Sequence, residues 1–345
     1  MADARRVSDL GEFGLIEMLA QSLPVADRAA AGLQLGIGDD AAVWRPAAGE
    51  DVVITVDSLV EDIHFRLDWT DWERLGHKVL AVNISDLAAM GATPKLAVVS
   101  MGLRGDERVA DLQACYRGLG ALARRHGMTV AGGDIVRSPS ATLFHVTALG
   151  ETRNRRALTC SGARPGDIIA VSGTLGASAA GLRLLALDRD DPRRQAATAD
   201  ILIEAHLRPE PRVALGHILL EHAASAAMDL SDGLLGDLPK ILSASEVSGE
   251  IDARRVPVAA ALPALFPDDW LDLALRGGED YELLFTAPPE AWDDIVSAAA
   301  AVGASVTAIG TILPRRTNES VLEMIDTNGV RQRVQAGAFD HFRPA

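Results

Sequence analysis

The chain has 345 residues, 48% of them hydrophobic and 23% charged, and this length suggests about two globular domains. Its formal net charge of -15 disfavours nucleic acid as a partner, because no long run of Lys and Arg reverses the negative field. No run approaches the roughly 18 apolar residues of a membrane span, and acids interrupt the N-terminus where a signal peptide would be apolar. We therefore expect a cytoplasmic protein with no membrane partner.

The first half of the chain alternates apolar, strand-like runs with longer helical stretches, which is typical of α/β or α+β layering. Strands are expected at 51–56, 95–101 and 142–149, and helices near 72–90 and 107–126. Gly127 follows three basic residues and is expected to end the second helix before a strand that starts at Met128.

A polar and basic segment from Gly150 to Gly166 predicts a domain boundary, which we place between domains 1–150 and 151–345. The second half predicts its own α/β unit. Its strands are expected at 167–173, 226–230, 281–287 and 304–313, and its solvated loops at 187–195 and 313–320.

Several acids of the first half lie in apolar or glycine-rich settings. Asp39 and Asp40 stand between glycines that allow a sharp turn, although this signal alone is weak. Asp57 closes the run VVITVD, at the end of a predicted buried strand, where a metal ligand and a turn cap are about equally common. Asp86 shares one face of a nearly apolar helix with Asn83, so its carboxylate needs a cation, an ion pair or hydrogen-bond donors.

The same pattern continues after other predicted strands. Asp134 follows the sequence TVAGG, whose glycines would let backbone amides approach a phosphate. Asp229 and Asp232 flank Ser231 where a strand leads into a helix. Either Ser231 or Asp232, taken alone, could be a simple N-cap. Glu279 follows a glycine pair and precedes another strand.

Acids gathered in this number would repel one another, and divalent cations resolve that repulsion. Oxygen ligands without His or Cys at metal spacing favour Mg²⁺ or Mn²⁺ over zinc. The two cysteines, Cys115 and Cys160, are too far apart for a zinc knuckle and are expected to be reduced. No GxxxxGK[ST] loop, protein-kinase motif set, HExxH or GxSxG is present, so a polyphosphate substrate would be held mainly through metal.

The motifs GEFGLI, GIGDDAAV, VDSLVEDIHF, KVLAVNISDLAAMGA, AGGD, LTCSGARPGD, HLRPEPR, MDLSDGL, GGEDYEL and terminal FDHF occur in consistent order between Gly11 and Phe342. Together they resemble the thiamine-monophosphate kinases, a family of the aminoimidazole ribonucleotide synthetase superfamily. The resemblance implies an α/β (α+β) fold of two domains, with ATP in the cleft. It also implies a homodimer in which the N-terminal sheets form a barrel, and an N-terminal domain that holds metal and nucleotide.

The resemblance also implies roles for individual residues. It assigns several Mg²⁺ ions to Asp40, Thr55, Asp57, Asp86, Asp134, Asp229 and Asp232. The nucleotide would contact Tyr116, Gly133, Asp134 and Ser231, and thiamine monophosphate would contact His64, Glu279 and Phe339. A flat aromatic ring at Phe339 suits a cationic thiazolium, although a C-terminal core anchor is the plainer reading.

Two positions depart from the family pattern. Cys160 stands where members often carry an arginine near the nucleotide, so Arg155, Arg156 or Arg164 would have to replace that contact. Val56 stands where some members carry a second hydroxyl, so a metal contact there would use the backbone carbonyl.

The resemblance implies transfer of the ATP γ-phosphoryl group to an acceptor phosphate that is already ionised, so no catalytic base is expected. One alternative is another ATP-using synthetase of the superfamily. A selenophosphate synthetase is disfavoured because no cysteine precedes Cys115. A second alternative is a regulator that binds Mg-ATP without turning it over.

Overall fold

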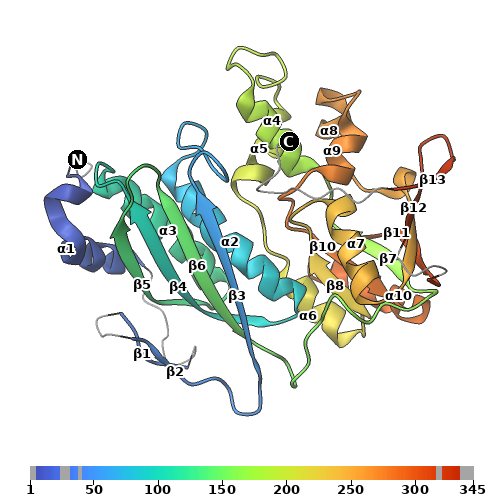
Figure 1. The fold of residues 1–345 in the computed structure, drawn as a ribbon, viewed down its shortest axis with the longest axis horizontal. Helices are drawn as coiled ribbons and strands as arrows, with labels where there is room; N and C mark the ends of the chain where they lie inside the picture. The colour runs from blue at the N-terminus through green and yellow to red at the C-terminus, as the bar shows by residue number, and fades with distance from the viewer. Residues whose placement is uncertain (1–4, 24–31, 38–40, 316–320, 335–345) are drawn as a thin grey trace. The chain divides into compact units, whose positions relative to one another are not determined.

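The structure of the protein is a computed structural model that describes residues 5–23, 32–37, 41–315 and 321–334. The chain divides into two compact units, whose elements are labelled in Figure 1. Unit 1 comprises Met1–Leu87 and Ala92–Arg155, and unit 2 comprises Ala88–Gly91 and Arg156–Ala345. None of the described helices is both long and apolar enough to cross a membrane.

Unit 1 is built on a four-stranded sheet with helices α2 and α3 on one of its faces (Figure 1). Its elements are α1 (Val7–Ser22), β1 (Leu33–Leu35), β2 (Val43–Trp44), β3 (Val52–Val60), α2 (Trp72–Ala89), β4 (Thr93–Leu103), α3 (Val109–Arg125), β5 (Thr129–Arg137) and β6 (Leu143–Glu151). The strand order is β3-β6-β4-β5, with β4 and β5 parallel and the other neighbours antiparallel. Strands β1 and β2 form a separate antiparallel pair.

Strand β3 has one face toward the helices and one face toward solvent. Ile54 and Val56 are 64% and 51% exposed, whereas Thr55 and Asp57 are half-buried and Leu59 is buried. Successive side chains of a strand point to opposite faces, so this alternation directs Thr55 and Asp57 toward the helical layer. The sequence pattern of β3 therefore determines which polar groups can meet α2.

Helices α2 and α3 approach each other closely at two glycines. A Cβ atom at Gly76 would lie 1.8 Å from the carbonyl oxygen of Cys115, and one at Gly118 would lie 1.9 Å from that of Glu73. Real Cβ contacts are never this short, so only glycine permits the crossing. Burial in this contact raises the pKa of the Cys115 thiol to about 12, as befits an inert structural cysteine.

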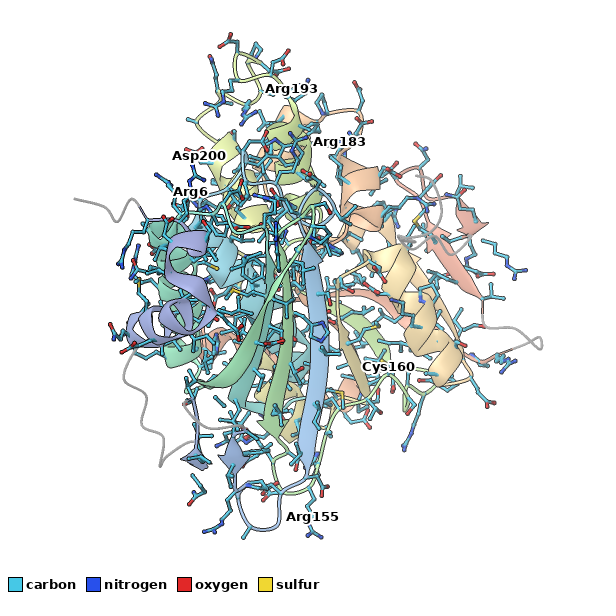
Figure 2. All side chains as sticks on the ribbon, turned by 60° about the vertical axis from the view of Figure 1, so that its left-hand side comes forward. Arg6, Arg155, Cys160, Arg183, Arg193 and Asp200 are labelled. Atoms are coloured by element: carbon cyan, nitrogen blue, oxygen red, sulfur yellow. The ribbon has the colours of Figure 1, made fainter. Side chains whose placement is uncertain are left out.

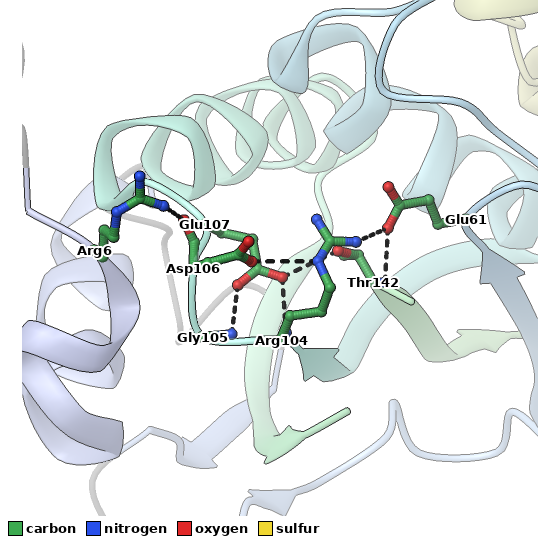
Figure 3. Close-up of polar contacts among 7 residues, drawn as sticks. All are labelled: Arg6, Glu61, Arg104, Gly105, Asp106, Glu107 and Thr142. Atoms are coloured by element: carbon green, nitrogen blue, oxygen red, sulfur yellow. Dashed lines mark hydrogen bonds and ion pairs between the residues drawn. The ribbon is translucent and has the colours of Figure 1, made fainter. Parts of the chain in front are cut away.

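A buried polar network ties the end of β3 to the loop between β4 and α3 (Figure 3). Glu107, which is 5% exposed, accepts hydrogen bonds from the amides of Arg104 and Gly105, both at 2.8 Å, and from the Thr142 hydroxyl at 3.1 Å. Glu61 accepts from the Thr142 amide at 2.8 Å and pairs with the Arg104 guanidinium. Every acid in the network is hydrogen-bonded, as buried charges require.

Unit 2 is built on a seven-stranded sheet in the order β13-β12-β9-β11-β7-β10-β8, with only β12 and β9 parallel. Its elements are β7 (Ile168–Ser172), α4 (Ala177–Ala186), α5 (Ala199–Leu207), α6 (Val213–Glu221), β8 (Ala226–Asp229), α7 (Leu234–Ala244), β9 (Ser248–Asp252), η1 (Ala253–Arg255), α8 (Ala261–Leu265), α9 (Trp270–Arg276), β10 (Leu283–Ala287), η2 (Pro289–Ala291), α10 (Trp292–Ala301), β11 (Val306–Leu313), β12 (Leu322–Ile325) and β13 (Arg331–Arg333).

Apolar clusters cover both faces of this sheet. Strand β10 is buried along its whole length. Leu284 belongs to a cluster that includes Leu184 of α4 and Leu238 of α7, whereas Phe285 belongs to a second cluster that includes Leu219 of α6. A strand buried on both faces reads as a continuous apolar run, as the sequence LLFTA does.

Most predicted elements are confirmed. The helices predicted near 72–90 and 107–126 are α2 and α3, and the segment 187–195 contains no helix or strand. The mixed α/β class is also confirmed, but no sheet formed by the described residues closes into a barrel within one chain. Only residues 313–315 of the second predicted loop fall within the described part of the chain.

Candidate active site

A pair of carboxylates joins β3 to α2 in unit 1. The Asp57 and Asp86 side chains are half-buried and hydrogen-bonded to each other. The Thr55 hydroxyl, two residues before Asp57 on the same face of β3, donates a hydrogen bond to Oδ2 of Asp86. Asp86 meets Thr55 and Asp57 from α2. Its place in a nearly apolar helix predicted that its carboxylate would need such a partner.

The two carboxylates perturb each other strongly. Burial, followed by the charge of Asp86 and the hydrogen bond with it, raises the pKa of Asp57 to about 7. Burial also raises the pKa of Asp86, against the lowering effect of its hydrogen bonds from Thr55 and Asp57. Two carboxylates this close share a proton unless a cation lies between them. Perturbed pKa values of this kind cluster at functional sites, which makes the pair a candidate ligand site.

Asn83 lies three residues before Asp86 on α2. It is 0% exposed, and its Oδ1 atom has no hydrogen-bond partner among the described residues, while its Nδ2 atom donates weakly to the Val79 carbonyl oxygen at 3.4 Å. Residues at i and i+3 share one face of a helix, so Asn83 and Asp86 lie on the same side of α2. An unsatisfied buried oxygen is costly and indicates a missing partner.

The sequence prediction that Asp57 and Asp134 end their strands is wrong. β3 continues beyond Asp57 to Val60, and β5 continues beyond Asp134 to Arg137. Each of these acids lies within its strand, and a polar residue that interrupts an apolar run resembles a strand end in the sequence.

The sheet does not bring Asp134 next to Asp57. Asp134 is exposed and pairs with Ser100 of β4, in a row that continues through His145 of β6 to Ser58 of β3. Strands β3 and β5 are separated by β6 and β4, which places their backbones roughly 14 Å apart. Gly133 has no room for a side chain, because a Cβ atom would lie 2.0 Å from the Val99 carbonyl oxygen.

The remaining unit 1 candidates occupy different environments. His64 lies in the loop after β3, and its Nδ1 atom accepts a hydrogen bond from the Val60 amide at 3.1 Å, so a neutral ring carries its proton on Nε2. Tyr116 is only 7% exposed on α3, where burial and then the neighbouring Cys115 raise its pKa. Asp40 lies outside the described residues.

In unit 2 the acids surround a turn between β8 and α7. Asp229 is the last residue of β8, one residue before the end predicted for this strand, and Ser231 and Asp232 follow in the turn. The amides of Ser231 and Asp232 donate to Oδ2 of Asp237 at 3.1 and 2.9 Å, and Lys240 bonds to Asp232 at 2.6 Å. Asp232 is therefore ion-paired in this structure.

The motif GGEDYEL forms an anchoring segment beside that turn. The amides of Glu279 and Tyr281 donate to the carbonyl oxygens of Ser231 and Leu230, both at 2.9 Å. Glu279 and Tyr281 have positive φ angles of 66° and 51°, which are strained for residues other than glycine. Such strain persists only where surrounding contacts impose it, so this segment is strongly constrained.

The three acids of the motif reach three different elements. Oε2 of Glu279 lies 3.4 Å from Nδ1 of His206 on α5. Asp280 accepts from the amides of Gly176 and Ser178 at the start of α4, at 2.6 and 3.0 Å. Burial nevertheless raises the pKa of Asp280 to about 7, against the lowering effect of these amides.

The last acid of the motif, Glu282, forms a buried ion pair. It is 5% exposed and makes two hydrogen bonds with Arg212, which immediately precedes α6. The Ser172 hydroxyl of β7 also donates to Glu282. Gly173 leaves the room for this carboxylate, because a Cβ atom there would lie 2.0 Å from Oε1.

Two further sequence predictions concern Cys160 and Phe339. Cys160 is half-buried (Figure 2), and burial followed by the charge of Asp229 raises its pKa. The Nε atom of Arg155, also labelled in Figure 2, donates to the Gly49 carbonyl oxygen at 2.7 Å, while Arg156 donates to that of Leu220. Phe339 lies outside the described residues.

Sequence reasoning did not single out Asp237, Lys240, Arg212 or Glu282 as functional residues. The i, i+3 spacing of Asp237 and Lys240 was a usable signal for an ion pair on one helix face. Arg212 and Glu282 are 70 residues apart, and no local pattern connects them.

The family models agree with this organisation. The model of the AIR synthase related protein N-terminal domain matches residues 38–152, and that of the C-terminal domain matches residues 164–323. The thiamine-monophosphate kinase of Bacillus subtilis (strain 168) is 37% identical over 311 residues, which cover 90% of this chain and 94% of that protein. The chain belongs to the thiamine-monophosphate kinase family.

The fold of this chain is also similar to solved structures of this family. A thiamine-monophosphate kinase from Stenotrophomonas maltophilia K279a superposes with a TM-score of 0.79 at 39% identity, covering 91% of this chain and 96% of that one. The structure of "AaThiL complexed with AMPPCP and TMP" superposes with a TM-score of 0.75 at 32% identity, covering 98% and 99% of the two chains.

The magnesium expected of a kinase fits the donor set of unit 1. Thr55, Asp57 and Asp86 offer only oxygen atoms, and hard divalent ions prefer such ligands. Within the described residues, no three His, Cys, Asp or Glu side chains are grouped so as to hold a metal ion. The described part of unit 1 thus contains one pair of adjacent carboxylates, Asp57 and Asp86.

Proposed function

We propose that this protein phosphorylates thiamine monophosphate to thiamine diphosphate with ATP, by direct in-line transfer. Family membership over nine-tenths of the chain supports the substrate pair. The observation that carries the chemistry is the Asp57–Asp86 pair, whose raised pKa values mark a place built for positive charge.

The proposed roles follow the family pattern. Mg²⁺ would be held by Asp40, Thr55, Asp57, Asp86, Asp134, Asp229 and Asp232. The nucleotide would contact Tyr116, Gly133, Asp134 and Ser231, and thiamine monophosphate would contact His64, Glu279 and Phe339. Bound Mg²⁺ supplies neutralisation of phosphate charge. The constraint on Glu279 holds that carboxylate in one orientation.

The chain needs no general base for this reaction. The attacking oxygen belongs to a phosphate that is ionised at neutral pH, and a new bond from it to the γ-phosphorus forms as the bond to the β,γ-bridging oxygen breaks. ADP leaves with the bridging oxygen. The residues of the site therefore act by positioning two anions and by offsetting their repulsion.

Phosphorus NMR of the protein incubated with Mg-ATP and thiamine monophosphate tests this function. Formation of thiamine diphosphate and ADP in equal amounts is expected. ADP with inorganic phosphate and no thiamine diphosphate would indicate another ATP-using synthetase of the superfamily. Unchanged ATP would indicate a regulator that only binds the nucleotide.

We further propose that unit 1 forms a homodimer in which two sheets make a barrel. The open face of β3 supports this, because Val52, Ile54 and Val56 leave an apolar stripe 39%, 64% and 51% exposed. Contiguous exposed apolar surface is typical of an interface.

Ile54→Asp is expected to convert the dimer to a monomer, because it places a charge in the middle of that stripe. Light scattering coupled to size-exclusion chromatography measures the mass directly. Val302→Asp, at an apolar residue of unit 2 that is 50% exposed, is the matched control and should leave the mass unchanged. A dimer that persists with Ile54→Asp would contradict the proposed interface.

A cytoplasmic location agrees with this function. Cys115 and Cys160 are both free thiols, which is the usual state in a reducing compartment. The proposed co-substrate, ATP, is generated and consumed there. Detecting a tagged full-length chain in separated cell fractions checks the cytoplasmic location.

A further inference from the structure

We propose that Asp237 is a positioning residue of the phosphoryl-transfer site, acting on Ser231 and Asp232 through their backbone amides, with Lys240 as the shared counter-ion. This inference rests on the function proposed above. Asp237 lies in the first turn of α7 and is 0% exposed. Burying a carboxylate is costly unless it is fully hydrogen-bonded, so its partners indicate what it serves.

One oxygen of Asp237 holds the turn. Oδ2 accepts from the amides of Ser231 and Asp232, the two turn residues proposed to contact nucleotide and metal. Gly233, with a φ of 87°, completes the turn where a Cβ atom would lie 2.7 Å from the backbone of Arg276. The direction of two consecutive amides is therefore set by one carboxylate that has no contact with solvent.

The other oxygen holds the counter-ion. Nζ of Lys240 lies 2.8 Å from Oδ1 of Asp237 and 2.6 Å from Oδ2 of Asp232. Asp237 thus fixes the backbone of Asp232 directly and its side chain through Lys240. These contacts orient the Asp232 carboxylate before a cation binds. The cation must then share that carboxylate with the ammonium group of Lys240.

The turn has a second support that separates positioning from folding. The carbonyl oxygens of Ser231 and Leu230 accept from the amides of Glu279 and Tyr281, and these bonds do not involve Asp237. Loss of Asp237 should therefore release the amides of the turn without unfolding unit 2.

Asp237→Asn is the decisive variant. It preserves the size of the side chain, but it removes the negative charge and leaves one acceptor oxygen where the carboxylate has two. Asp252→Asn is the matched control: Asp252 also accepts from a backbone amide, that of Arg254 at 3.0 Å, and also pairs with the side chain of that residue. Lys240→Met is the second variant, since it removes the counter-ion and leaves the amide bonds.

Hydrogen exchange of residues 230–234 and steady-state kinetics are measured on the full chain, with Mn²⁺ binding followed by electron paramagnetic resonance. Asp237→Asn should speed exchange and lower kcat by about tenfold each, with KM for thiamine monophosphate nearly unchanged. Lys240→Met should leave exchange slow and bind Mn²⁺ more tightly. Asp252→Asn should change none of these values.

Unchanged exchange and kcat in folded Asp237→Asn would overturn the positioning role, as would equal losses in Asp252→Asn. The exchange and Mn²⁺ measurements need no substrate. If the wild-type protein formed no thiamine diphosphate, the proposed function would fail, and faster exchange with weaker Mn²⁺ binding in Asp237→Asn would still support the positioning of the turn.

Discussion

Asp57→Asn is expected to lower the rate of phosphoryl transfer by about a thousandfold, because losing the proposed Mg²⁺ ligand forfeits several kcal/mol of charge stabilisation in the transition state. The same change should stabilise the protein in EDTA, since it removes one of two carboxylates that repel each other across β3 and α2. An asparagine can still hydrogen-bond to Asp86. Single-turnover rates at saturating Mg²⁺ and thermal unfolding in EDTA measure the two effects.

The opposite signs of these effects make the test specific. A substitution that merely damaged the fold would lower both activity and stability. Asp51→Asn, at an exposed carboxylate just before β3, is the control and should alter neither. A near-normal rate in Asp57→Asn would remove the Asp57–Asp86 pair from the mechanism.

The carboxylate pair also predicts how stability depends on pH in the absence of divalent cations. The pKa of Asp57 is about 7 in the folded state and about 4 in the unfolded chain. Below the unfolded value both states are protonated and the pair costs nothing. As pH rises from about 4 to about 7, the unfolded chain releases its proton first, so the folded state loses stability progressively.

The measurement is the free energy of unfolding of the wild-type protein minus that of Asp57→Asn, from pH 5 to pH 8 in EDTA. The difference should become more unfavourable to the wild type as pH rises, and level off above about pH 7. Added Mg²⁺ should reduce it. A difference that is constant across this range would show that the pair does not titrate with folding.

Arg212→Met should destabilise unit 2 by about 2–3 kcal/mol, because it leaves Glu282 buried without its ion partner. Glu282 is 5% exposed, and Arg212 is about two-thirds buried beside it. The remaining donor is the Ser172 hydroxyl, which carries no charge. Urea unfolding at pH 7 measures the loss.

A comparison pair distinguishes this cost from that of losing any ion pair. Arg254→Met removes the partner of Asp252 at the surface and should cost much less, because water solvates what remains. Adding Glu282→Gln to Arg212→Met should recover part of the stability, since the buried charge is then gone. Equal losses in the two single variants would refute the buried-charge explanation.

Local sequence patterns predicted the elements well because their causes are local. The helix at Trp72–Ala89 follows from an apolar stretch with helical spacing, and the buried run LLFTA predicts a core strand. The strand ends were wrong at Asp57 and Asp134, because a polar residue inside a strand reads like a terminus whichever face of the sheet it occupies. Which face is open depends on the helices, which the strand sequence does not encode.

The site was predictable in part for the same reason. The burial of Asp86 follows from its own helix, so an unusual partner could be expected. Glu282 instead depends on Arg212 at a distance of 70 residues, and the strain at Glu279 and Tyr281 arises from hydrogen bonds to another turn. Such contacts are properties of the tertiary fold.

The glycine contacts between α2 and α3 set the rotational phase of the helix that carries Asp86. The ten residues from Gly76 to Asp86 span about 15 Å, or nearly three turns. A small rotation of α2 about its own axis at Gly76 therefore changes the direction of the Asp86 carboxylate. At Gly76 and Gly118 the backbones of α2 and α3 are in direct contact, with no side chain between them. The orientation of the Asp86 carboxylate is thus governed by the absence of a methyl group at Gly76 of α2 and at Gly118 of α3.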